Sequence, residues 1–146
     1  MTKIILSAVG IVAVLCGLIL NLHNIYYLVF ITPAIMFLSG CIMYEVRTFP
    51  NCVFGYKTGI SMRNQDTWDF ANRYSGMLWM KWSVPLLIVS ELIMFLLKPS
   101  PAIAEGMILI QLIPVLAVIP FTEKALDKTF DRQGNRREEY KTEEEL

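Results

Sequence analysis

Residues 49–68, FPNCVFGYKTGISMRNQDTW, form a polar and aromatic stretch that interrupts a chain of long apolar runs. A link between two membrane spans needs far fewer residues, so a connection of this length predicts a structural or functional role. Pro50 favours an extended residue before it and ends any preceding helix. Gly55 and Gly59 permit backbone turns that other residues disfavour. The stretch therefore predicts a folded loop rather than a simple tether.

A long helix is predicted to begin inside this stretch. Asn64 is suited to be its N-cap, and Asp66 and Asp69 in the first turns favour the positive end of the helix dipole. One stripe of this helix repeats every four residues and contains Asn64, Trp68, Asn72 and Gly76. We expect one helix that begins beside the membrane surface and continues into the next apolar run.

Four apolar runs are long enough to cross a membrane, in a chain that is 55% hydrophobic with a mean hydropathy of +0.49. Each run approaches the ~20 residues that a helix needs to span a hydrocarbon core about 30 Å thick. The predicted spans cover residues 4–20, 25–44, 77–97 and 103–121. The predicted fold class is an all-α integral membrane protein, a four-transmembrane-helix bundle within residues 1–131.

Small residues and prolines within the spans predict how the helices pack. Pro33, Pro85 and Pro114 lie inside predicted spans, where neighbouring helices can satisfy the carbonyls that a proline leaves without a donor. Ala13 and Gly17 form a small-xxx-small pair that favours close packing of the first span. That packing would occur either within the bundle or in a homo-oligomer.

The distribution of basic residues predicts the orientation. If the N-terminus is inside, all but one of the 13 lysines and arginines fall on the same side of the membrane, and Lys98 alone falls on the other. The positive-inside rule then places both termini and the 45–76 loop in the cytoplasm. Residues 132–146 carry mixed charge and few apolar side chains, so we expect a disordered cytoplasmic tail.

The loop also resembles the signature of the SdpI-type immunity protein family. The resemblance covers about residues 49–76, and Lys57 stands where that family usually has arginine. It implies a small polytopic protein of the bacterial plasma membrane, whose best-known relative protects a bacterium from its own secreted peptide toxin. That relative also captures a soluble repressor at the membrane. The signature positions are occupied by Pro50, Asn51, Gly55, Thr58, Asn64 and Trp68.

Two interpretations of the loop remain open. In the first, its polar side chains cap turns and Trp68 anchors at the membrane interface. In the second, the loop and the helix start bind an anion such as a lipid headgroup, through free N–H groups and Lys57, Thr58 and Arg63. The loop lacks the glycine spacing of a nucleotide-binding P-loop. The candidate ligand or partner site contains Pro50, Asn51, Gly55, Lys57, Thr58, Arg63, Asn64, Trp68 and Asn72.

Glu91 and Gln111 form a second candidate site, inside the membrane. An ionised carboxylate at this depth is costly, so burial should favour the protonated form of Glu91. Counting about 1.5 Å per residue places Gln111 within a turn of the same depth on the next span. A hydrogen bond between Glu91 and Gln111 is the simpler expectation, and a proton or ligand site is the alternative.

Enzyme chemistry finds little support in the sequence. His23 is the single histidine, and the three cysteines are distributed between two spans and the loop. We therefore expect no enzyme, metal, cofactor or nucleic-acid partner. Three functions remain open: protection against a membrane-active peptide toxin, a sensor that signals to a cytoplasmic regulator, and binding of membrane lipid headgroups.

Overall fold

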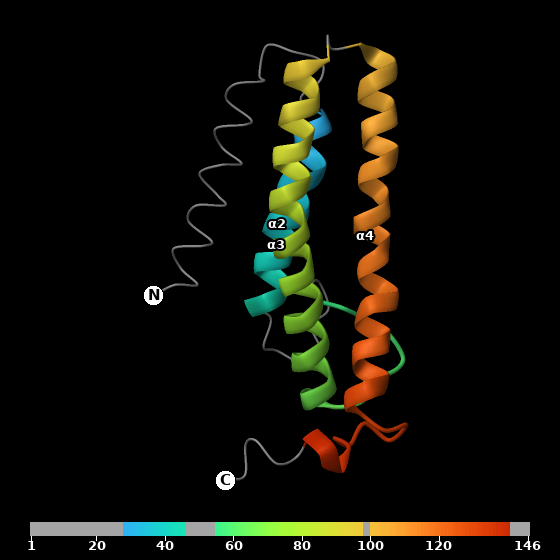
Figure 1. Cartoon of the computed structure of the whole chain (residues 1–146). Helices are drawn as coiled ribbons and strands as arrows, with labels where there is room; N and C mark the ends of the chain where they lie inside the picture. The colour runs from blue at the N-terminus through green and yellow to red at the C-terminus, as the bar shows by residue number, and fades with distance from the viewer. Residues whose placement is uncertain (1–27, 46–54, 98–99, 141–146) are drawn as a thin grey trace.

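The computed structural model describes residues 28–45, 55–97 and 100–140, so the predicted span 4–20 and the signature residues Pro50 and Asn51 lie outside the described residues. The described chain is helical (Figure 1). Its elements are α2 (Leu28–Glu45), α3 (Gln65–Leu96), α4 (Pro101–Thr129) and the short 3₁₀ helix η2 (Glu138–Tyr140).

Helices α3 and α4 are long and apolar enough to cross a membrane, and α2 is a shorter apolar helix. Only 11% and 17% of the most apolar windows of α3 and α4 are buried inside the protein. Phe95 is 85% exposed and Leu109 67% exposed, which for a water-soluble protein would be an unusually apolar surface. In the described residues these features are those of a helical membrane protein.

The predicted long helix is confirmed as α3, which runs without interruption for 32 residues. Asn64 is its N-cap, because the Asn64 side chain accepts a hydrogen bond from the Thr67 backbone N–H at 2.9 Å. The Thr67 hydroxyl in turn accepts from the Asn64 N–H at 3.1 Å, which completes a reciprocal capping box. The predicted span 77–97 therefore covers only the apolar part of a longer helix.

Two glycines bring α2 and α3 into close contact. A Cβ atom added to Gly76 would lie 2.6 Å from the backbone oxygen of Gly40, and one added to Gly40 would lie 2.8 Å from the oxygen of Gly76. Small residues at such crossings let two membrane helices approach at backbone distance. The contact holds α2 against the first half of α3.

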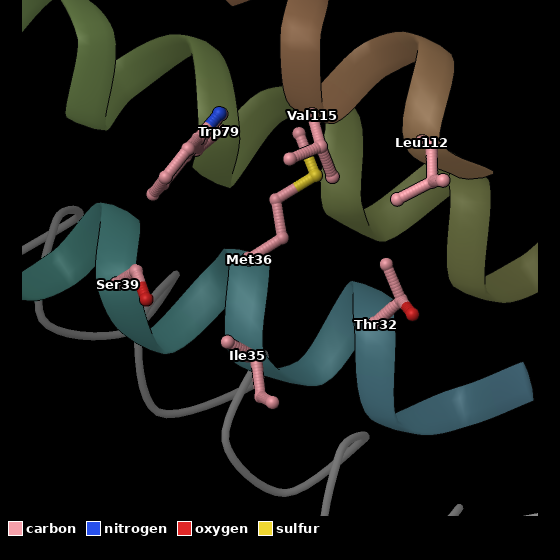
Figure 2. A pocket seen from close by; sticks show the side chains of 7 residues that line it. All are labelled: Thr32, Ile35, Met36, Ser39, Trp79, Leu112 and Val115. Atoms are coloured by element: carbon pink, nitrogen blue, oxygen red, sulfur yellow. The ribbon is translucent and has the colours of Figure 1, made fainter. Parts of the chain in front are cut away.

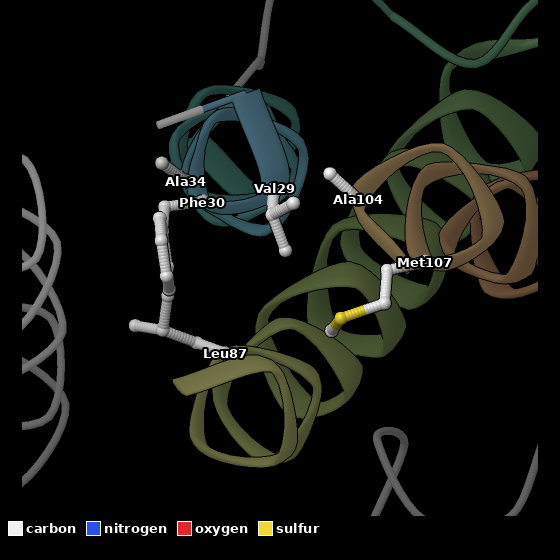
Figure 3. Packing of buried hydrophobic residues seen from close by; sticks show 6 residues of the cluster. All are labelled: Val29, Phe30, Ala34, Leu87, Ala104 and Met107. Atoms are coloured by element: carbon white, nitrogen blue, oxygen red, sulfur yellow. The ribbon is translucent and has the colours of Figure 1, made fainter. Parts of the chain in front are cut away.

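At the end of the bundle where α2 and α4 begin, all three helices form an apolar core (Figure 3). Beside it, Gln111 of α4 is almost fully buried and donates hydrogen bonds from Nε2 to the Val29 backbone oxygen and to Ser90 Oγ, both at 2.8 Å. The predicted bond between Gln111 and Glu91 is therefore wrong. Ser90, one residue and about 100° earlier on α3, faces α4 in its place. The core residues are Val29, Phe30, Ala34, Leu87, Ala104 and Met107.

The start of the charged tail is folded, which corrects the predicted disorder for residues 132–140. Phe130 and Arg136 pair as an antiparallel bridge, and the Arg137 N–H donates to the Thr129 oxygen at 3.0 Å. Gly134 closes the turn with a φ of 88°, a region that favours glycine. We call residues 130–140 the C-terminal turn.

Candidate functional site at the start of helix α3

Tyr56 attaches the signature loop to both long helices. Its hydroxyl donates to Glu123 Oε1 at 2.8 Å and lies 3.2 Å from the Ile119 backbone oxygen, both on α4. Its backbone N–H donates to Asn72 Oδ1 on α3 at 2.7 Å. Burial of the phenol, together with the hydrogen bond to Glu123, raises the pKa of Tyr56 well above its ordinary value. The side chain is therefore a neutral donor across the physiological range.

The signature residues Asn72, Trp68 and Gly55 form the packed centre of this region. Asn72 is fully buried, and its Nδ2 donates to the Trp68 backbone oxygen at 2.8 Å. Trp68 is also fully buried, so its indole ring packs inside the protein and not on the outer surface of the helices. Gly55 has a φ of 134°, and a Cβ atom there would lie 2.6 Å from Trp68 Cζ2. The backbone conformation and the indole ring both require glycine at this position.

The following turn is closed by hydroxyl groups. Ser61 is fully buried, and its Oγ donates to the Tyr56 backbone oxygen and accepts from the Thr58 N–H, each at 2.8 Å. Thr58 Oγ1 lies 3.2 Å from the same Ser61 oxygen. Thr58 therefore takes part in a local turn, as the capping interpretation predicts.

Asn64 joins the loop and α3 to the C-terminal turn. While its Oδ1 caps α3, its Nδ2 donates to the Gly134 backbone oxygen at 2.8 Å. Beside it, the guanidinium of Arg136 makes two hydrogen bonds of 2.7 Å to the carboxylate of Asp66. Such two-point pairs fix orientation as well as charge. The signature residue Asn64 thus contacts a segment that lies 70 residues further along the sequence.

The C-terminal turn has its own anchor in Asp131. The Asp131 carboxylate accepts from the backbone N–H groups of Asn135 and Gln133, both at 2.8 Å. These hydrogen bonds, led by that from Asn135, lower the pKa of Asp131. The Asp131 carboxylate is therefore ionised at neutral pH, in the form that accepts these hydrogen bonds.

The groups that anion binding would require are largely engaged within the protein. Thr58 and Asn64 make the internal hydrogen bonds described above, and the Arg63 Nε donates to the Gly59 oxygen at 3.4 Å. Lys57 and Arg63 are exposed to solvent. The described part of the loop therefore forms a capped and packed turn with basic side chains on its surface.

The structure brings together most of the predicted loop residues and leaves the intramembrane pair apart. Glu91 is partly buried on α3, while Gln111 faces Val29 and Ser90. Sequence reasoning missed Tyr56, although it directly follows the signature glycine. It also missed the pairing of Arg136 with Asp66, for which the sequence carries no local signal.

The fold and this site define a helical membrane protein with a folded cap at one end of its long helices. The model of the SdpI/YfhL protein family matches residues 48–122, a range that contains the loop, α3 and most of α4. The chain therefore belongs to the SdpI/YfhL protein family, as the resemblance of the loop predicted. Comparisons with curated proteins and with solved structures give no significant match.

Proposed function

We propose that this chain is a bacterial membrane immunity protein that protects its cell from a membrane-active peptide toxin. Membership of the SdpI/YfhL family supports this role. The observation that carries the proposal is the convergence of Gly55, Asn64, Trp68 and Asn72 in one packed unit at the start of α3. A unit of this rigidity is suited to present a binding surface.

The surface of the unit supplies chemistry for binding. Lys57 and Arg63 are exposed on the loop, while the residues beneath them are fixed by buried hydrogen bonds. In our proposal the loop lies in the cytoplasm, as the positive-inside rule predicts. Protection would come from binding the toxin or from altering the site that the toxin attacks.

A survival assay tests the proposed function. A toxin-sensitive Gram-positive host would express the chain or carry the empty vector and meet a series of secreted membrane-active peptides. Improved survival with at least one peptide, at unchanged growth without peptide, is the expected result. Equal killing of both strains by every peptide, with the protein present in the membrane, would contradict the proposal.

A membrane sensor is the second candidate function, and one specific contact favours it. The C-terminal turn is held on the signature loop through Asn64 and Gly134 and through Asp66 and Arg136. A conformational change in the loop would therefore be transmitted to the segment that leads into the charged tail. A soluble protein that co-purifies with the full chain and is lost on deletion of residues 130–146 would support this function. Retention of that protein by the shortened chain would contradict it.

A further inference from the structure

A groove about 190 Å³ in volume lies between α2 and α4 (Figure 2). Its α2 wall contains Thr32, Met36 and Ser39, which lie on one helical stripe because they are separated by four and three residues. Leu112 and Val115 of α4 form the opposite wall. The two walls therefore belong to helices that run in the same direction (Figure 1).

The groove combines apolar walls with polar groups that a lipid tail would leave without partners. Thr32 and Ser39 place hydroxyls in it, and Trp79 of α3 also lines it. The Trp79 Nε1 is buried and has no hydrogen-bond partner among the residues that the structure describes. Hydroxyl-bearing and small residues are typical of surfaces between membrane helices. These walls therefore fit another helix better than lipid.

We propose that residues 4–20 of this same chain pack as a helix into the groove. Only residues 21–27 separate this apolar run from the start of α2 at Leu28, and a connection this short joins helices that are antiparallel neighbours. The run is also long enough to accompany the whole of α2 through the membrane. A segment of the same chain, close in sequence to α2, can thus occupy the groove.

The register of the two segments supports this placement. In an antiparallel pair joined between Leu20 and Leu28, two residues lie at equal depth when their numbers add up to roughly 48, because each residue advances about 1.5 Å. Three small residues of the run then lie within about one residue of the depths of three positions on the α2 wall. The pairs are Gly17 with Thr32, Ala13 with Met36 and Gly10 with Ser39.

The three small residues also share one face. Gly10, Ala13 and Gly17 are separated by three and four residues, which places them on a single helical stripe. Helices present such stripes where backbones approach closely. With this stripe directed into the groove between α2 and α4, residues 4–20 would complete a four-helix bundle.

Cysteine cross-linking in native membranes tests the placement. The background is the full chain with Cys16, Cys41 and Cys52 changed to alanine. The first test pair is G10C with S39C on the α2 wall. The second is A13C with V115C on the α4 wall, which a helix can reach only from the groove.

Two control pairs calibrate the experiment. The pair G10C with L38C reports a different face of α2, because Leu38 lies one residue from Ser39 in depth, is 44% exposed and does not line the groove. The pair M80C with the restored Cys41 should cross-link in any folded sample, because the sulfur atoms of Cys41 and Met80 lie 3.6 Å apart.

We expect both test pairs to cross-link within the monomer, several-fold more than the pair with L38C. Preferred cross-linking to L38C would place the run on a different face of α2 and overturn the proposal. Cross-linked dimers from the test pairs would make a second copy the occupant and overturn it as well. If neither test pair cross-links while M80C and Cys41 do, residues 4–20 do not occupy the groove. That result would also overturn the proposal.

Discussion

The side chain of Gln111 replaces the hydrogen-bond donor that Pro33 removes from α2. In a regular helix the N–H of residue 33 would bond to the Val29 oxygen, but proline has none. Gln111 Nε2 lies 2.8 Å from that oxygen and so satisfies it from the neighbouring helix. This agrees with the expectation that neighbours compensate prolines in membrane helices.

Replacing Gln111 by leucine should therefore destabilise the protein by about 0.6–2 kcal/mol, the range measured for hydrogen bonds between membrane helices. The same change should cost less when Pro33 is alanine, because the N–H of residue 33 then bonds to Val29. A double-mutant cycle of unfolding in detergent measures this coupling. Equal costs in the two backgrounds would show that the bond to Val29 contributes no stability.

Ser90→Ala is the matched control for this cycle. It removes the other acceptor of Gln111 Nε2 and leaves the bond to Val29 in place. The loss of unfolding free energy caused by Ser90→Ala should be the same whether residue 33 is proline or alanine. A cost that changes with residue 33 would mean that the two hydrogen bonds are not separable.

Gly55→Ala should destabilise the protein by roughly 2–4 kcal/mol, because overpacking and an unfavourable φ act together. The added methyl group would meet the Trp68 ring in a loop held at a φ of 134°. Gly59→Ala is the control, since a Cβ atom there meets nothing within 4 Å. The midpoints of thermal unfolding of the two variants should differ by several degrees. Equal midpoints would show that the close contact at Gly55 does not determine stability.

Arg136→Ala should loosen the C-terminal turn by about 0.2–1 kcal/mol, as expected for a partly exposed ion pair. Hydrogen exchange of the Asp131 and Arg137 amides, which donate within the turn, should become up to roughly 5-fold faster. Arg132→Ala removes an exposed charge from the same turn and should leave these rates unchanged. Equal acceleration by both variants would assign the effect to net charge rather than to the pair with Asp66.

Tyr56 should make the protein sensitive to alkaline pH. A folded-state pKa above the ordinary value means that the unfolded chain loses the phenol proton first. The stabilisation is thus fully present below about pH 10, the ordinary tyrosine pKa, and is lost as the pH rises through the folded-state pKa. The difference in unfolding free energy between wild type and Tyr56→Phe should shrink above about pH 10. A constant difference from pH 8 to 11 would contradict this.

Much of the fold follows from local patterns in the sequence. The four-residue recurrence from Asn64 to Gly76 and the capping chemistry of Asn64 were sufficient to predict the long helix α3. The resemblance of the loop was sufficient to predict the family. These features are encoded by residues close together in the chain, and local physics determines them.

The remaining features depend on partners distant in sequence. The charged tail has the composition of a disordered segment, yet hydrogen bonds to Asn64 and Asp66 fold its first residues. The choice of Ser90 over Glu91 as the partner of Gln111 depends on a rotation of one residue about the α3 axis, about 100°. Counting depth along a helix predicts the layer in which a side chain lies, but not the direction in which it points.

The most direct test of the proposed immunity function compares variants of the loop and of the membrane interior in the survival assay. Cells would express wild type, Lys57→Ala or Glu91→Gln at matched membrane levels and meet a peptide against which the wild type protects. We predict that Lys57→Ala loses most of the protection and that Glu91→Gln keeps it. The reverse pattern, with protection lost only in Glu91→Gln, would contradict a site in the loop and place it inside the membrane.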